Sequence, residues 1–259
     1  MSRRFPTRRR PSKSSALTLI PLSRALNMNP IYRLPPVVQN AIFRASDVGE
    51  TIDWGLSQMG IPETWASTMG EGVNVAVLDT GADLSHPDLS GAIIQAENFS
   101  RSPFGAQDRA GHGSHCAGII GARRDSRGVV GVAPKSNLLI GKVLGDDGSG
   151  YDESIVAGFE WAIANRADVI SGSFGSPAPS QRQAAVIAKA VERGIFVIIA
   201  AGNDGADNSV NYPGRLESVI CVAASDRSGQ IADFSSRGPE VDIAAPGVEI
   251  LSCWPNGKY

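Results

Sequence analysis

The chain has 259 residues, of which 42% are hydrophobic and 19% charged, so it holds enough apolar material for one large soluble domain or two small ones. No apolar run is long enough to cross a membrane, which excludes an integral helical membrane protein. Residues 1–46 carry nine Lys or Arg and no acid, whereas residues 47–259 carry fifteen basic and twenty-six acidic residues, a balance of −11. This asymmetry predicts a basic leader joined to an acidic domain.

The leader, residues 1–48, is open to several interpretations. A secretion signal would explain its basic start, but the apolar stretch "ALTLIPL" is short, is interrupted by Pro21 and has no clear cleavage site. The basic run is also typical of nucleic-acid binding. We favour a disordered leader, or a chain that begins at Met28, and expect neither a nucleic-acid partner nor a membrane partner.

The chain contains three cysteines, Cys116, Cys221 and Cys253. An odd and small number argues against a disulfide framework, although three suffice for one bridge. Free thiols indicate a reducing compartment, and we therefore favour the cytoplasm over secretion.

From residue 70 onward, apolar runs alternate with segments of helical period. Such alternation predicts an α/β fold with a parallel central sheet flanked by helices, whose ligand sites lie beyond the carboxyl ends of the strands. In chain order we expect strands over 73–81, 137–144, 168–173, 195–202 and 218–225, and helices over 152–167 and 180–194, the second ending at Gly194.

Asp79 follows the first of these strands directly, in "VAVLDTG". Its simplest interpretation is a turn residue that closes a strand. A hydrophobic run before Asp-Thr-Gly is also the signature of aspartic proteases, which need two carboxylates that share a proton. With a single Asp-Thr-Gly this chain would have to dimerise, and the α/β pattern disagrees with an all-β protease.

Two histidines lie three residues apart in "GHGSHCAGIIG", residues 111–121. A zinc site would use His112, His115 and Cys116, but zinc hydrolases place their histidines at i and i+4 with a Glu between them, and no Glu occurs here. A buried structural role suits His115. It suits His112 less well, because the flanking glycines leave its ring accessible.

Asn203 follows another predicted strand, in "AAGNDG". Alone it is typical of a turn. Together, Asp79, His112 and Asn203, expected at three strand ends, suggest an orienting carboxylate, a general base and an oxyanion donor.

Seven stretches in order resemble blocks of the subtilisin-like serine proteases, from about Glu50 to Tyr259. They are "VAVLDTGADLSHPDL", "GHGSHCAGIIG", "GVAPKSNLLIGKVLGDDGSG", "VISGSFGSP", "AAGNDG", "YPGRLESVICVAASD" and "DFSSRGPEVDIAAPGVEILS". The resemblance implies a peptidase domain over 49–259, His112 as the general base, Asp79 as its orienting partner and Asn203 as the oxyanion donor. Cys116 would pack beneath His112.

The resemblance also implies how a peptide or protein substrate binds to a monomer. Two glycine-bearing edges would offer backbone groups to an extended peptide, which adds as a strand, and a pocket would hold the side chain before the cleaved bond. The edges are Gly148, Ser149, Gly150 and Ser173, Phe174, Gly175; the pocket residues are Ala200, Ala201, Gly202 and Asn211; and Pro213 resembles a family cis-proline.

A structural calcium ion is a further implication. Asp88, Asp125 and Glu50 fall where the family places oxygen ligands, which calcium prefers. The alternative is that these acids are solvated on loops, since three arginines crowd the same segment.

The nucleophile of the family, a Ser in Gly-Thr-Ser-Met-Ala, does not occur in this sequence, which ends in "SCWPNGKY". We therefore expect a serine endopeptidase whose Ser and C-terminal helices lie beyond Tyr259, with this chain itself nearly inactive. The alternatives are a non-catalytic peptide-binding fragment or degenerate relative, and the dimeric aspartic protease. The leader would fit a short propeptide that blocks the cleft.

Overall fold

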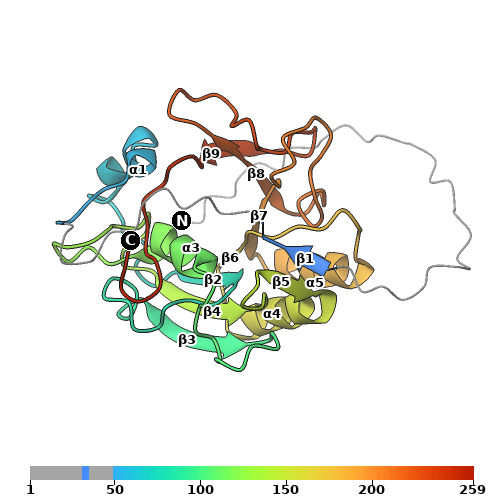
Figure 1. Cartoon of the computed structure of the whole chain (residues 1–259), viewed down its shortest axis with the longest axis horizontal. Helices are drawn as coiled ribbons and strands as arrows, with labels where there is room; N and C mark the ends of the chain where they lie inside the picture. Colours follow the sequence, from blue (N-terminus) through green and yellow to red (C-terminus); the bar gives the residue numbers. More distant parts are fainter. Residues whose placement is uncertain (1–30, 35–48) are drawn as a thin grey trace, which may run out of the picture.

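The computed structural model describes residues 31–34 and 49–259, and its centre is a seven-stranded parallel sheet (Figure 1). The strands follow the order β3-β4-β2-β6-β7-β8-β9. Their bounds are β2 Asn74–Asp79, β3 Ile93–Asn98, β4 Asn137–Lys142, β6 Val169–Gly172, β7 Phe196–Ala200, β8 Ile220–Ser225 and β9 Ile243–Pro246. Because all are parallel, the carboxyl ends of β2 and β7 lie at the same edge, with β6 between them.

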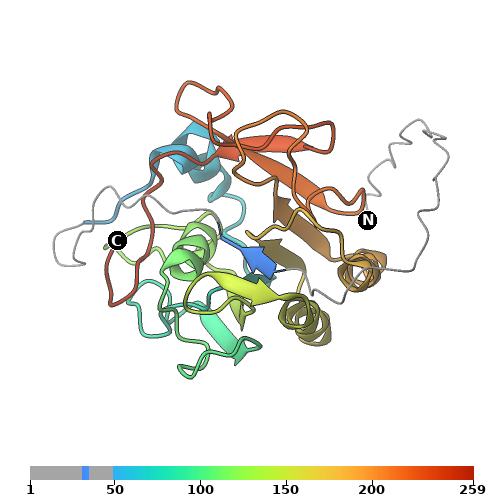
Figure 2. The same cartoon turned by 45° about the vertical axis from the view of Figure 1, so that its right-hand side comes forward.

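Helices cover both faces of this sheet, and α3 lies on the opposite face from α4 and α5 (Figure 2). Side chains of β2 alternate between the two cores: Val75 and Val77 pack in the cluster that includes α3, whereas Leu78 packs in the cluster of α4 and α5. The helix bounds are α1 Trp54–Gln58, α2 Ile61–Thr64, α3 His112–Gly121, α4 Asp152–Ala164 and α5 Gln181–Glu192.

The predicted parallel α/β sheet is confirmed, and each predicted strand and helix is present with ends shifted by a few residues. Helix α5 begins after Ser180, whose side chain accepts a hydrogen bond from the Gln183 amide, and Gly194 beyond its end has a positive φ of 82°. The sequence did not signal β3, half of whose side chains are exposed, or the short strand β9.

A second, two-stranded sheet lies beside the main one. It pairs β1 (Ile31–Arg33) with β5 (Ser149–Tyr151) in antiparallel register, as Figures 1 and 2 both show. Strand β1 comes from the leader, and the rest of the predicted leader, 1–30 and 35–48, lies outside the described residues.

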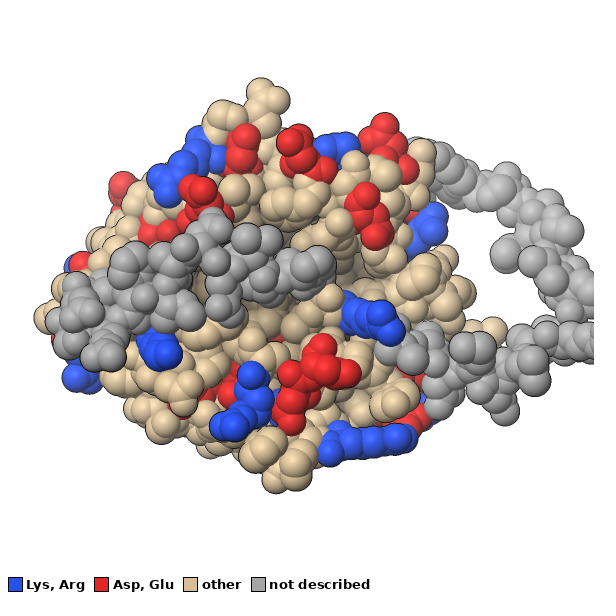
Figure 3. Space-filling view, viewed as in Figure 1, with Lys and Arg blue, Asp and Glu red and all other residues tan. Residues whose placement is uncertain are grey.

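The described surface is of mixed charge, and acidic and basic side chains alternate over the face seen in Figure 3. Among residues 31–34 and 49–259, no helix is long and apolar enough to span a bilayer. The three cysteines are free, as expected. The predicted cis peptide bond is present between Tyr212 and Pro213.

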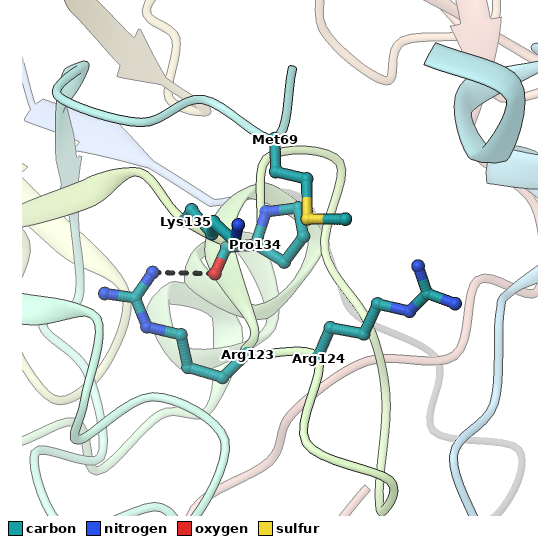
Figure 4. Close-up of a pocket in the computed structure, with 5 residues that line it drawn as sticks. All are labelled: Met69, Arg123, Arg124, Pro134 and Lys135. Carbon is teal, nitrogen blue, oxygen red and sulfur yellow. Dashed lines mark hydrogen bonds between the residues drawn. The ribbon is translucent and has the colours of Figure 1, made fainter. Parts of the chain in front are cut away.

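A cavity of about 460 Å³ lies where the C-terminal end of α3 meets the loop before β4 (Figure 4). Met69, Arg123, Arg124, Pro134 and Lys135 line it. The guanidinium of Arg123 donates to the carbonyls of Gly91, Pro134 and Ser136, so it ties three loops together. Figure 4 shows Arg124 directed away from this network. The cavity lies at the opposite end of α3 from His112, and we treat it as structural.

Candidate active site

The carboxylate of Asp79 and the imidazole of His112 form a direct pair. Both carboxylate oxygens lie within hydrogen-bonding distance of His112 Nδ1, at 2.8 and 2.9 Å. Asp79 is 1% exposed at the carboxyl end of β2, whereas the His112 side chain, at the first position of α3, is 15% exposed. The pair fixes the ring through Nδ1, and Nε2 lies 3.9 Å from Cys116 Sγ.

A buried carboxylate that the sequence gave no reason to single out holds the start of α3. Asp108 Oδ1 accepts from Thr80 Oγ1 and from the amides of Ala110 and Gly111, each at 2.9 Å. Asp108 Oδ2 accepts from the Ser114 amide at 2.8 Å and its hydroxyl at 2.7 Å. This carboxylate therefore ties the first turn of α3 to the residue that follows Asp79.

Glycine lets α3 approach β2 closely enough for the pair to form. A Cβ at Gly113 would overlap the carbonyl oxygen of Gly81, and the Gly113 amide donates to Thr80 Oγ1 at 2.9 Å. Further along α3, Gly118 lies against Ser252 and Cys253. The small residues around the histidines are thus explained by close backbone packing.

The surroundings of His112 change its acidity. Burial lowers the pKa of His112, but the negative charge and hydrogen bond of Asp79, with a contribution from Cys116, outweigh burial and hold that pKa well above its usual value. Asp79 therefore stabilises the imidazolium form of His112. The arrangement suits a histidine that gains and loses a proton while Asp79 keeps its charge.

The neighbouring histidine does not join this group. His115 Nε2 contacts the carbonyl of Ile250 at 3.0 Å, so the trio considered for zinc, His112, His115 and Cys116, is not brought together. Burial lowers the pKa of His115. Cys116 Sγ lies 3.7 Å from His112 Nδ1 and 3.8 Å from Ser173 Oγ. The thiol therefore lies between the histidine and the edge after β6.

Asn203 lies in an exposed bend just after β7. The strand order places this bend at the same sheet edge as Asp79, since β2 and β7 both flank β6. Close by in the chain, Ala201 is buried and Asn211 donates from Nδ2 to Asp204 Oδ2 at 2.7 Å. Gly202 has a positive φ of 112°, and a Cβ there would crowd Asn211.

Strand β1 lies between the two edges that the sequence singled out as peptide-binding. Tyr32 is in register with Gly150 of β5, and the amide of Leu34 donates to the carbonyl of Gly148 at 3.0 Å. On the other side, the amide of Arg33 donates to the carbonyl of Gly175 at 3.4 Å. An extended segment of the chain therefore runs antiparallel to one edge and bonds to both.

The side chain of Tyr32 is fully buried below this strand. Its ring meets Phe174 edge to face, with centroids 6.1 Å apart and planes at 86°. Tyr32 belongs to the same apolar cluster as Ile155, Phe159 and Ile187. The sequence gave no signal for this contact, because a three-residue strand has no measurable period.

The three acids considered for calcium gather around one loop, residues 123–131. Glu50 Oε2 accepts from the Ser126 amide at 2.7 Å, and Asp88 Oδ2 accepts from the Val129 amide at 2.9 Å. Among the described residues, Asp88 Oδ1 is buried without a hydrogen-bond partner, and burial together with the charge of Asp125 raises the pKa of Asp88. The side chains of Glu50, Asp88 and Asp125 are not brought together in one ligand group, and the potential ligands that lie closest to Asp88 are His86 and Cys253. The Tyr259 hydroxyl also interacts with Asp88.

Two of those acids also have cationic neighbours. Arg124 lies 3.5 Å from Glu50, and Arg127 lies 3.1 Å from Asp125. These arginine side chains are 44% and 59% exposed, so the pairs contribute little to stability.

Comparison with known proteins agrees with the geometry. The model of the subtilase family matches residues 70–258. The chain belongs to the subtilase family. It is 40% identical over 242 residues to the major intracellular serine protease of Bacillus subtilis strain 168. The alignment covers 90% of this chain and 75% of that protein. An aspartic protease is therefore excluded as the family of this chain.

Other relatives give the same result. The subtilase is 43% identical to the intracellular serine protease of Paenibacillus polymyxa, over 79% of this chain and 65% of that protein. It is also 43% identical to subtilisin E of Bacillus subtilis strain 168, over 83% of this chain and 57% of that protein. The chain thus spans about 57 to 75% of the length of these three relatives.

Proposed function

We propose that this subtilase chain supplies the acid–base half of a serine endopeptidase, with Asp79 as the orienting carboxylate and His112 as the general base. One observation carries the proposal: both oxygens of a buried carboxylate hold His112 Nδ1, and the His112 side chain remains 15% exposed. The nucleophilic Ser would follow Tyr259 in the complete enzyme. The 259-residue chain alone is then nearly inactive.

The chemistry follows from the positions of the two side chains. His112 Nε2 takes the proton of the Ser hydroxyl while its oxygen attacks the peptide carbonyl, and the carbonyl electron pair moves onto oxygen, where Asn203 Nδ2 donates a hydrogen bond. His112 then gives its proton to the leaving amine as the C–N bond breaks. His112 then deprotonates a water that attacks the acyl ester, and it returns this proton to the Ser oxygen as the ester C–O bond breaks.

The substrate is a peptide or protein segment in extended form. Its backbone would bond to the edge Gly148–Gly150 on one side and to Gly175 on the other, as strand β1 does. Ser173 and Phe174 continue the second edge. The pocket for the side chain before the cleaved bond would be formed by Ala200, Ala201, Gly202 and Asn211.

The leader is the natural occupant of the cleft before activation. Residues 31–34 already bond to both edges, so a substrate must displace them. The match to the Bacillus subtilis intracellular protease covers 90% of this chain, more than residues 49–259 alone make up, so it reaches into the leader. We therefore assign residues 1–48 as a short inhibitory propeptide and residues 49–259 as the peptidase domain.

Calcium would draw Asp88, Asp125 and Glu50 together and hold the loop 123–131 against residues 49–51, which already bond to that loop. Bound calcium supplies positive charge to the buried oxygen of Asp88 and no step of hydrolysis. Adding calcium to a chelator-treated sample at about 100 times its Kd should raise the free energy of unfolding by about 2.7 kcal/mol. Asp88→Asn should abolish this increase; an equal increase in the variant would contradict the assignment.

A non-catalytic peptide-binding role is the second candidate, because no Gly-Thr-Ser-Met-Ala motif occurs in the sequence while the leader occupies a peptide site. The two are separated by reading the coding DNA past the codon for Tyr259. An in-frame Gly-Thr-Ser-Met-Ala within about a dozen codons, and a fluorophosphonate label on the extended chain but not on the 259-residue chain, support hydrolysis. An immediate stop codon supports binding alone.

A further inference from the structure

The pocket that holds Tyr32 is apolar on most sides but has one polar wall. Gln183 of α5 is 1% exposed and Asp152, at the start of α4, is 4% exposed. Gln183 Nε2 donates to Asp152 Oδ1 at 3.0 Å. Polar side chains buried this deeply beside an apolar cluster are costly unless each hydrogen-bonding atom has a partner.

Two polar atoms of this pocket lack a partner within the described part of the chain. They are Gln183 Oε1 and the phenolic oxygen of Tyr32, both buried. The phenol lies close to the polar wall: burial raises the pKa of Tyr32, the charge of Asp152 raises it further, and an interaction with the Gln183 side chain acts in the opposite direction. The pocket therefore holds a hydroxyl donor, that of Tyr32, and a carbonyl acceptor, Gln183 Oε1, each without a partner.

The orientation of the Gln183 amide is fixed. The carboxylate of Asp152 can only accept, so Gln183 must turn Nε2 toward it and Oε1 away from it. Asp152 itself lies in the first turn of the 13-residue helix α4, where negative charge is stabilised. The two oxygens are not within hydrogen-bonding geometry of each other as they stand, and a short displacement of the phenol toward Gln183 Oε1 would satisfy both unpartnered atoms.

We propose that Gln183, oriented by Asp152, selects tyrosine over phenylalanine for this pocket, in the leader and, on the basis of the proposed function, in the extended substrates that replace the leader. Phenylalanine fills the same volume and keeps the edge-to-face contact with Phe174. It leaves Gln183 Oε1 buried without a donor, and the penalty for such an atom exceeds the value of the hydrogen bond itself. Gln183 is thus a specificity-determining residue.

Hydrogen exchange on the full 259-residue chain tests this without catalysis. The amides of Arg33 and Leu34 donate to Gly175 and Gly148, so their exchange reports how often the leader leaves the cleft. Tyr32→Phe should accelerate exchange of these amides by about fivefold to tenfold. A purely apolar pocket predicts the reverse, slower exchange, because phenylalanine costs less to bury than tyrosine. Whether these amides exchange faster or slower in Tyr32→Phe therefore distinguishes a pocket with a polar acceptor from a purely apolar one.

Gln183→Met provides the second arm, because methionine fills a similar volume without an acceptor of that strength. In this background Tyr32→Phe should no longer accelerate exchange and should instead slow it, because the Tyr32 hydroxyl has lost its acceptor and phenylalanine then costs less to bury. The matched control is Gln181→Met, on the exposed side of α5, which should leave the fivefold to tenfold effect intact. An equal effect of Tyr32→Phe in all backgrounds would overturn the proposal, as would unprotected amides in the original chain.

The hydrogen-exchange test of the selectivity and the hydrolysis test of the proposed function can fail independently of each other. Loss of hydrolysis in an extended chain would refute the endopeptidase while leaving the exchange result standing. Conversely, active enzyme with no coupling between Tyr32 and Gln183 would refute only the selectivity.

Discussion

Asp108→Asn is the change that most sharply tests how the fold positions His112. The carboxylate accepts five hydrogen bonds, three at Oδ1 and two at Oδ2, and is 1% exposed. If the side-chain NH2 of the asparagine takes the place of Oδ1, the backbone amides of Ala110 and Gly111 lose their acceptor. If the NH2 takes the place of Oδ2 instead, the Ser114 amide loses its acceptor, while the Ser114 hydroxyl can accept from the NH2 and turn its own O–H elsewhere. The second orientation is therefore preferred.

One buried amide without an acceptor costs about 1–3 kcal/mol. With a central value of about 2 kcal/mol, and about 2–4 °C per kcal/mol for a domain of this size, Tm should fall by about 4–8 °C. Urea unfolding and a thermal scan measure both quantities. Asp226→Asn is the control, since this carboxylate also accepts several hydrogen bonds from nearby residues but lies in a turn at the surface. Equal loss in the two variants would refute the role given to Asp108.

Two further changes address the pair itself. Because the pKa of His112 is raised, the pair stabilises the fold fully below the unfolded pKa of about 6.5, and this stabilisation is lost as pH rises through the folded pKa. Asp79→Asn should therefore destabilise the chain more at about pH 6 than at about pH 9, and a pH-independent difference would contradict the pairing. Gly113→Ala forces a Cβ into the Gly81 carbonyl, so urea unfolding should show a loss of about 1–3 kcal/mol; an unchanged midpoint would count against the close approach.

The sheet and the position of the histidine could be predicted because their signals are local. Strand β2 is a continuous apolar run that ends at Asp79, and glycines flank His112. Asp108 gave no signal, since its importance comes from bonds to groups that only the fold brings together. The same holds for the contact of Tyr32 with Gln183, residues 151 positions apart in the chain. Strand β3 was missed because its exposed side chains obscure the period.

The roles assigned to Asp79 and His112 were suggested by resemblance to a family, and the geometry supplies a physical reason for them. Asp79 ends β2, His112 begins α3, and the close helix–strand contact at Gly113 brings their side chains together. Asn203 stays a prediction, since its role depends on where a substrate carbonyl lies. The calcium ligands also stay predictions, although the unpartnered oxygen of Asp88 favours them.

The central claim, that Asp79 and His112 form the acid–base half of a hydrolytic site, is tested most directly by peptide hydrolysis. The assay compares the chain extended in frame beyond Tyr259 with its Asp79→Ala and His112→Ala variants. We expect the extended chain to cleave a peptide, Asp79→Ala to lower kcat by about 10⁴-fold and His112→Ala by about 10⁶-fold, with the fold intact by circular dichroism. Hydrolysis that persists undiminished in His112→Ala would contradict the account.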